Sequence, residues 1–269
     1  MSDGDETGDP YDLDAGPDPA AYAAAGPESD PESRILRDEP AVHAVGIGPG
    51  NPEYLVPRAE RAIREAEVVV GFETVVDFVR DRTDADLLTC SYRDEAETLG
   101  TFTERVANGA RGTAVLMGDP NHSGYQFVGK VERAVDMATD DERSVRIVPG
   151  ISSLQVAASR ARTPMEDATF VTLHKSGDLG DDVARLRRDA GERHLLVLPR
   201  PFDWMPGDVA VDLLEHGCVA DDVVLVCERL THDDEAITRT TVGELAAHAG
   251  GDGRDDTPFS DLSVLVVRR

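Results

Sequence analysis

Lysine is almost absent from this chain, because only Lys130 and Lys175 of its 27 basic residues are lysines. Positive charge is scarce in general, and 53 acidic residues leave a formal net charge of −26. Nucleic acids and anionic membranes attract proteins of the opposite sign, so neither is an expected partner. Such an acidic surface repels itself in dilute buffer, whereas in molar salt the Debye length falls to about 3 Å. The composition therefore predicts a halophilic protein from a salt-rich cell.

Cysteine and long apolar runs are also scarce. Cys90, Cys218 and Cys227 share no spacing typical of a metal site, and an odd number of cysteines fits a reducing compartment. No apolar stretch approaches the roughly 18 residues of a membrane-spanning helix, and no apolar signal core begins the chain. The sequence contains no nucleophile elbow, Walker loop or zinc motif. These absences predict a cytoplasmic protein without a metal centre or a membrane partner.

The chain divides into an acidic tail and two longer segments. Residues 1–40 contain twelve acidic residues, six prolines and four glycines, with few large apolar side chains, so a disordered acidic tail is expected. Most of the 53 acidic residues lie beyond this tail. In residues 41–150 and again in 151–269, short apolar strands alternate with helical patterns. The alternation predicts an α/β fold of two α/β domains, each with a mostly parallel sheet, and a cofactor cleft between them.

Hydrophobic periodicity predicts the individual elements. The expected strands cover residues 42–47, 68–70, 113–117, 145–148, 169–173, 195–198, 223–227 and 262–267. The expected helices cover residues 53–67, 95–107, 152–161, 181–189 and 208–215.

Three glycine-bearing loops each follow an expected strand. They are residues 46–51 (GIGPGN), 118–124 (GDPNHSG) and 149–153 (PGISS). Loops at the carboxyl ends of parallel strands form the ligand crevice of α/β sheets, and glycine lets the backbone approach a ligand closely. The three loops together predict a site for a nucleoside-type cofactor. Asn51 occupies the third glycine position of the dinucleotide fingerprint, which argues against a nicotinamide-dependent oxidoreductase.

Several residues of these loops allow two interpretations. Asp119 can accept hydrogen bonds from ribose hydroxyls or cap a turn, and Ser152 and Ser153 can contact a ligand or cap a helix. His122 and Tyr125 can face a ligand or solvent. Elsewhere, Lys175 is either a surface residue or has a specific role, and the acidic run at 233–235 is interpreted as a solvated turn rather than a metal site.

The order of these motifs resembles that of the tetrapyrrole (corrin/porphyrin) methylases, which are S-adenosylmethionine-dependent methyltransferases. The similarity runs from about residue 42 to the C-terminus. Within this family, residues 47–55, 150–157, 172–174 and 227–231 look most like the enzymes that methylate C5 of cobalt-precorrin-7 in anaerobic cobalamin biosynthesis.

The resemblance implies a homodimer that binds S-adenosylmethionine between its two domains and methylates a corrinoid or other tetrapyrrole. It places the following residues at the cofactor: Pro49, Gly118, Asp119, Pro120, Gly124, Ser152, Ser153, Leu198 and Pro199. Asp119 is the expected catalytic residue, as a positioner rather than a proton carrier, because the sulfonium methyl group is already activated. A second methyltransferase domain is not fused to the chain, so a separate protein is expected to perform C15 methylation and decarboxylation.

Other functions remain open from the sequence. One is a methyltransferase of the same fold with another acceptor, such as a diphthine synthase or a 16S rRNA 2′-O-methyltransferase, although the acidic charge disfavours RNA. Another is a non-catalytic module that binds a corrinoid. A carboxylate-rich macrocycle would need local cations, for which Arg58, Arg93 and Arg160 are candidates.

Overall fold

A computed structural model describes residues 19–24, 42–122, 124–139, 144–175, 177–201, 203–250 and 257–269. The chain forms two compact units. The N-terminal unit comprises the chain up to Gly48 and Pro52–Ile151, and the C-terminal unit comprises Pro49–Asn51 and Ser152–Arg269. Within the described ranges, every helix is too short or too polar to span a bilayer.

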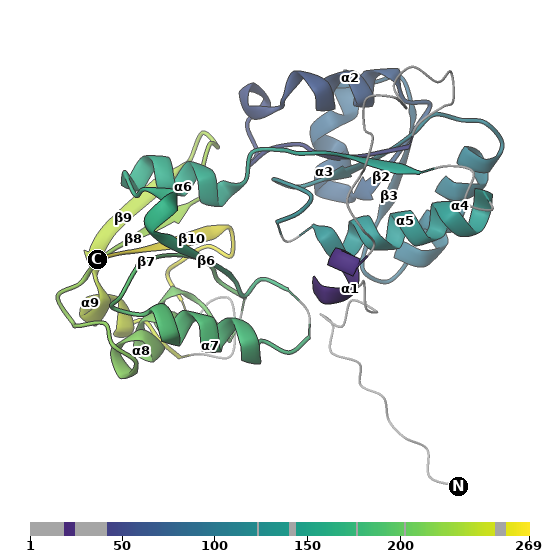
Figure 1. Ribbon diagram of the computed structural model, residues 1–269. Coiled ribbons are helices and arrows are strands. Elements are labelled where there is room, and N and C mark those ends of the chain that lie inside the picture. Colours follow the sequence, from purple (N-terminus) through teal and green to yellow (C-terminus); the bar gives the residue numbers. More distant parts are fainter. Residues whose placement is uncertain are drawn as a thin grey trace, which may run out of the picture. The chain divides into compact units, whose positions relative to one another are not determined.

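The N-terminal unit contains a five-stranded, fully parallel sheet in the order β3-β2-β4-β1-β5. Figure 1 labels β2 and β3 of this sheet. Its strands are β1 (Val42–Gly46), β2 (Val68–Phe72), β3 (Asp86–Cys90), β4 (Gly112–Leu116) and β5 (Val145–Val148). Its helices are α1 (Pro19–Ala24), α2 (Pro57–Glu65), α3 (Glu73–Val79), α4 (Glu95–Ala107) and α5 (Tyr125–Thr139), with 3-10 turns η1 (Pro52–Tyr54) and η2 (Arg80–Arg82).

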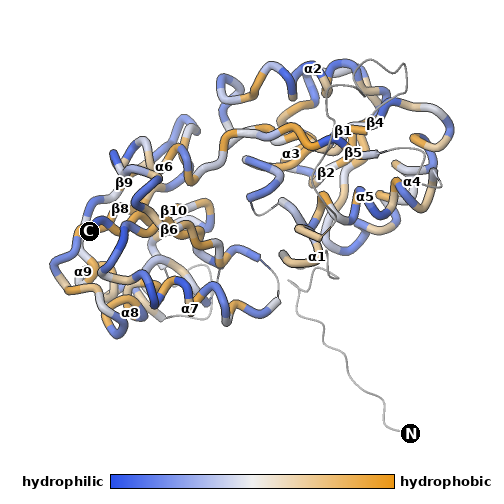
Figure 2. The backbone as a smooth tube through the Cα atoms, in the orientation of Figure 1, coloured by the Kyte–Doolittle hydropathy of each residue, from blue (hydrophilic) through white to orange (hydrophobic). Residues whose placement is uncertain are grey.

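Both faces of this sheet are covered by helices. Ile63 of α2 and Val76 of α3 pack in one apolar cluster, whereas Phe102 of α4 and Val131 of α5 pack in a second cluster on the opposite face. The strands β1, β2 and β4 in the middle of the sheet are therefore buried on both faces and mostly apolar, as their predominantly hydrophobic colour in Figure 2 shows. The connection through α2 leads from β1 to β2, and the connection through α5 leads from β4 to β5, in opposite directions from two neighbouring strands. The carboxyl ends of β1 and β4 thus form the topological switch point of the sheet.

The C-terminal unit contains a mixed sheet in the order β6-β7-β10-β8-β9. Its strands are β6 (Ala168–Thr172), β7 (His194–Leu198), β8 (Val223–Glu228), β9 (Ala236–Thr241) and β10 (Ser263–Arg268). Its helices are α6 (Ser153–Ala161), α7 (Gly180–Asp189), α8 (Pro206–Glu215) and α9 (Val242–Ala246), with the 3-10 turn η3 (Met165–Asp167). An apolar cluster joins the sheet to α7, α8 and α9 through Leu186, Leu213 and Leu245.

The α/β prediction is confirmed, but the expectation of a mostly parallel sheet is wrong for the C-terminal unit. Only β6 and β7 pair in parallel, and the other three pairings are antiparallel. A short turn joins β8 to β9, and no helical crossover separates them, so the two strands form an antiparallel pair.

Local differences from the expected elements have identifiable causes. The helix expected over residues 53–67 begins at Pro57, because proline favours the first helical position and holds Val56 in an extended conformation. The elements α3, α5, α9, β3 and β9 were not predicted from the sequence. The exposed edge strand β9 carries no apolar pattern that could reveal it. The disordered tail expected over residues 1–40 is wrong at Pro19–Ala24, which forms α1, and otherwise lies outside the described residues.

Both lysines form ion pairs that are largely withdrawn from solvent. Lys130 Nζ lies 2.8 Å from Glu95 Oε2, and Lys175 Nζ lies 2.5 Å from Asp182 Oδ2. All four side chains are at most 16% exposed. Lys175 is therefore a buried partner that joins the segment after β6 to α7, and it is not a surface lysine. Buried pairs are screened by salt much less than exposed ones.

Candidate functional site

The three predicted glycine loops meet at the carboxyl edge of the N-terminal sheet. A Cβ atom on Gly46 would lie 2.3 Å from the Gly118 carbonyl oxygen, and a Cβ on Gly150 would lie 2.1 Å from the same atom. The Gly150 Cβ would also lie 2.9 Å from Gly46 Cα. Only residues without a side chain permit this backbone contact, which we call the glycine junction (Gly46, Gly118 and Gly150).

Backbone hydrogen bonds hold the first two loops together beyond the ends of β1 and β4. Gly48 N donates to Gly118 O at 3.2 Å, and Gly118 N donates to Gly48 O at 2.9 Å. Both residues have positive φ angles, +82° and +64°, which glycine adopts without steric strain. The sequence prediction that these loops come together at one sheet edge agrees with this arrangement.

Asp119 links the second loop to the third. Its Oδ2 accepts a 2.9 Å hydrogen bond from Gly150 N, and its Oδ1 accepts one of the same length from Asn121 N. A carboxylate has about four acceptor positions, so these bonds leave capacity for a ligand donor. Asp119 therefore fixes the loop geometry, and its contact with a cofactor stays a prediction.

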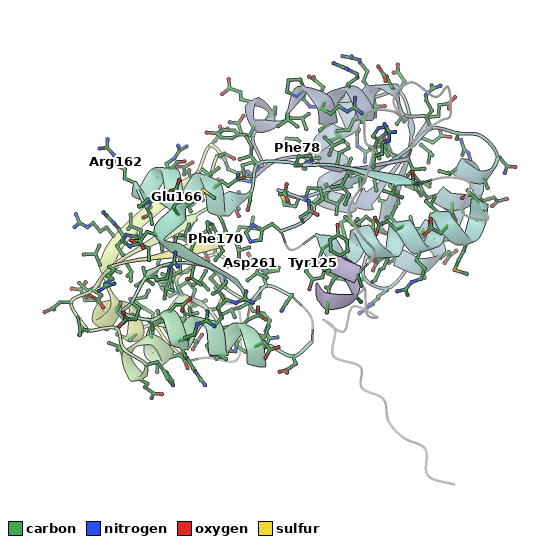
Figure 3. All side chains as sticks on the ribbon, viewed as in Figure 1. Phe78, Tyr125, Arg162, Glu166, Phe170 and Asp261 are labelled. Atoms are coloured by element: carbon green, nitrogen blue, oxygen red, sulfur yellow. The ribbon has the colours of Figure 1, made fainter. Side chains whose placement is uncertain are left out.

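The remaining predicted residues of this loop shape its path into α5. Pro120 is buried, and a Cβ on Gly124 would lie 2.9 Å from the Pro120 carbonyl oxygen, so the turn accepts only glycine. Tyr125, labelled in Figure 3, is the first residue of α5. Burial lowers the pKa of the His122 imidazole, although the Asp119 carboxylate acts in the opposite direction. The His122 ring is therefore neutral at neutral pH.

The other predicted residues belong to the C-terminal unit. Ser152 caps α6: its hydroxyl accepts from Leu154 N at 3.2 Å, and its own N–H donates to Gln155 Oε1 at 2.8 Å. This capping box confirms the capping interpretation for Ser152. Ser153 is the first residue of α6, and its ligand contact stays a prediction.

The tip of the first glycine loop packs on the turn after β8. Asn51 Nδ2 donates to the Thr231 carbonyl oxygen at 3.2 Å, and a Cβ on Gly50 would lie 2.1 Å from His232 Nε2. Thr231 has a φ of +71°, which is unusual for a β-branched residue, and Glu235 Oε2 accepts from its N–H at 2.7 Å. Asn51 thus has a structural role at the tip of this loop.

Two buried hydroxyls, of Thr172 and Ser263, lie on the strands either side of Leu198 and Pro199, at the carboxyl end of β7. Thr172 pairs with Leu198 in register, and Ser263 begins the neighbouring strand β10. Neither Thr172 Oγ1 nor Ser263 Oγ has a hydrogen-bond partner among the described residues. Both oxygens are shielded from solvent, and an unpaired buried hydroxyl costs about 1–3 kcal/mol. Isolated hydroxyls carry no sequence pattern, so neither residue was among the predicted site residues.

The predicted substrate-binding arginines and the acidic run at 233–235 differ in whether they form ion pairs. Arg160 Nε lies 2.7 Å from Glu235 Oε1, and Arg229 Nε lies 2.5 Å from Asp234 Oδ2. The acidic run at 233–235 is therefore partly ion-paired. The ion pairs formed between described residues include neither Arg58 nor Arg93. In the described part of the chain, His, Cys, Asp and Glu side chains form no cluster that could hold a metal ion.

The cysteines offer no nucleophile. Burial, with Glu95 and Asp94 nearby, raises the pKa of the Cys90 thiol to about 12. Burial, with Glu235 nearby, raises the pKa of Cys227 to about 12, and burial also raises the pKa of Cys218. The protonated thiol is a poor nucleophile, so covalent cysteine catalysis is not expected.

Comparison with known proteins identifies the family. The family description "Tetrapyrrole (Corrin/Porphyrin) Methylases" matches residues 41–246. This chain belongs to the tetrapyrrole methylases. The match begins at β1 and ends at α9, so it covers both sheets except β10 and excludes α1.

The chain is similar to two curated methyltransferases in sequence and to a solved structure in fold. A probable cobalt-precorrin-7 C(5)-methyltransferase of Methanocaldococcus jannaschii is 28% identical over 84% of this chain and 96% of that protein. An S-adenosyl-L-methionine-dependent uroporphyrinogen III methyltransferase of Methanosarcina barkeri is 27% identical over 77% of this chain and 85% of that protein. The uroporphyrin-III C-methyltransferase of Thermus thermophilus, solved with S-adenosylhomocysteine, aligns with a TM-score of 0.62 at 20% identity, over 85% and 92% of the two chains.

Proposed function

We propose that this methyltransferase transfers a methyl group from S-adenosylmethionine to C5 of cobalt-precorrin-7 in cobalamin biosynthesis. The observation that carries the proposal is the glycine junction at the switch point, in a chain that matches the methylase family over residues 41–246. The choice of corrinoid and ring position is supported by the Methanocaldococcus jannaschii relative, which aligns over 96% of its own length. Four motif stretches of the sequence support the same choice.

The protein's part in this reaction is positioning. S-adenosylmethionine supplies an activated methyl group, and Pro49, Gly118, Asp119, Pro120 and Gly124 would hold it together with the loops they belong to. Asp119 keeps two of these loops in a constant geometry through its bonds to Gly150 and Asn121. Correct alignment of two reactants can supply several kcal/mol of a barrier, so no acid–base pair is required.

In the C-terminal unit, the same proposal assigns cofactor contacts to Ser152, Ser153, Leu198 and Pro199. We further propose a homodimer in the cytoplasm of a salt-adapted cell, and a separate protein for C15 methylation and decarboxylation. Sedimentation in molar potassium chloride tests the dimer.

The deciding experiment is product mass spectrometry after incubation with S-adenosylmethionine and cobalt-precorrin-7. Addition of one methyl group without loss of carbon dioxide is the expected result, and fragmentation or NMR then locates the methyl group at C5. Parallel incubation with uroporphyrinogen III tests the substrate of the Methanosarcina barkeri relative. If the cofactor binds but neither macrocycle gains a methyl group, the corrinoid proposal is wrong, and a diphthine-type acceptor or a non-catalytic binding role takes its place.

A further inference from the structure

The carboxyl edge of the N-terminal sheet has two chemically different halves. The ends of β4, β1 and β5 carry the glycine junction. The ends of β3, β2 and β4 carry Tyr92, Phe72 and Met117, which we call the apolar shelf. Neighbouring strands lie about 4.8 Å apart, so three adjacent strand ends extend over about 10 Å. Met117 directly precedes Gly118, so the two halves are continuous.

The shelf combines exposure with rigid support. Tyr92 is 52% exposed and Met117 is 44% exposed. The Phe72 ring lies between the Tyr92 ring, at a centroid distance of 4.8 Å, and the buried Phe127 ring of α5, at 5.4 Å. Tilted ring pairs at these distances stabilise each other. The exposed Tyr92 ring is therefore held by the core through Phe72.

The position of these side chains is unusual for this protein. Aromatic residues make up 5% of the chain and charged residues 30%, and the described surface exposes few large apolar side chains. In the described part of the N-terminal unit, the exposed large apolar side chains are Tyr92, Met117 and Met137. Tyr92 and Met117 lie at the edge that carries the glycine junction, whereas Met137 lies far along α5. Exposed apolar groups concentrated at a ligand edge indicate a binding surface.

We propose that Phe72, Tyr92 and Met117 form the contact surface for the pyrrole-derived rings of the macrocyclic substrate, beside the loops assigned to the cofactor. This inference rests on the proposed function and adds substrate-binding residues to it. An aromatic shelf suits such rings, because planar ring faces pack in offset or tilted arrangements.

The charge of the protein explains why apolar contacts are needed. The net charge of −26 repels a macrocycle rich in carboxylates, and salt weakens any attraction to individual arginines. Apolar contact, by contrast, does not depend on charge and is not screened by salt. Arg93, next to Tyr92 in the sequence and exposed, provides one cation beside the shelf for a peripheral carboxylate.

The test compares four variants of the full chain: Tyr92→Ala, Tyr92→Phe, Met117→Ala and, as a matched control, Met137→Ala. Met137 is 79% exposed and lies away from the shelf, so its loss leaves binding unchanged. We expect Tyr92→Ala to raise the KM for cobalt-precorrin-7 about tenfold, Met117→Ala to raise it less, and Tyr92→Phe to restore it. The dissociation constant for S-adenosylmethionine and the melting temperature should stay at wild-type values. Added potassium chloride should not weaken substrate binding by the wild type.

The outcomes separate this inference from the proposed function. If the wild type methylates cobalt-precorrin-7 but Tyr92→Ala and Met117→Ala retain its KM, the apolar shelf is refuted and the function stands. If the wild type methylates only uroporphyrinogen III, the C5 assignment fails and the same variants test the shelf on that macrocycle. If the wild type neither binds nor methylates a macrocycle, both ideas are wrong.

Discussion

Gly150→Ala adds one methyl group at the most crowded point of the glycine junction. The new Cβ would lie 2.1 Å from the Gly118 carbonyl oxygen and 2.9 Å from Gly46 Cα, so whole loops must move. Overpacking of this kind costs about 1–3 kcal/mol. The same movement weakens the hydrogen bond between Gly150 N and Asp119, and a bond to a charged group contributes about 1.5–3 kcal/mol. We therefore expect a loss of about 3 kcal/mol or more.

Gly100→Ala provides the matched control. Gly100 lies inside α4, and a Cβ there would meet no atom within 4 Å. Alanine in an exposed helix interior is more favourable than glycine by about 1 kcal/mol, so this variant should be slightly more stable than the wild type.

The assay is thermal unfolding of both variants, followed by titration with S-adenosylmethionine. For domains of this size 1 kcal/mol shifts the melting temperature by about 2–4 °C, so Gly150→Ala should melt about 6–12 °C lower. Below the melting temperature, its cofactor affinity should also fall, whereas Gly100→Ala should bind normally. A Gly150→Ala protein with wild-type melting temperature would refute the close backbone packing on which the site is built.

Three further predictions follow from buried groups and loop contacts. Burial lowers the pKa of His43 to about 4, so on acidification the unfolded chain binds the proton before the folded chain does. The free energy of unfolding should therefore fall by about 2 kcal/mol between pH 7 and pH 5. In urea unfolding, His43→Asn should flatten this pH dependence, and a variant with the same pH dependence as the wild type would contradict the prediction. Asn51→Ala removes the hydrogen bond to the Thr231 carbonyl oxygen and should raise the KM for S-adenosylmethionine about fivefold with kcat preserved. An unchanged KM would show that Asn51 does not hold the first glycine loop in place for the cofactor. Lys130→Met leaves the Glu95 carboxylate buried without its cation and should lower the free energy of unfolding in urea by about 3–5 kcal/mol. Adding Glu95→Leu should restore most of this stability. If the double variant stays as unstable as Lys130→Met, packing and not charge is responsible.

Local patterns predicted four of the five strands of the N-terminal sheet and the place of its glycine loops. Runs of valine and alanine indicated buried parallel strands, and glycine at the ends of β1, β4 and β5 indicated close backbone approach. These signals are local because both depend on side-chain size and polarity at single positions. Edge strands such as β9 carry exposed residues on both faces, so the same reasoning could not find them.

The sequence by itself determined the α/β class, the methylase family motifs and the presence of a glycine-rich site, since periodicity and motif order are properties of the chain. Only the tertiary structure decided which alternative each polar residue adopts: Asp119 bonds two loops together, Ser152 caps α6, and Lys175 pairs with Asp182. It also decided that the C-terminal sheet is mixed and that Tyr92 and Met117 reach the edge of the glycine junction. The physical reason is that hydrogen-bond partners, strand pairing and exposure depend on residues distant in the sequence, which meet only when the chain is folded.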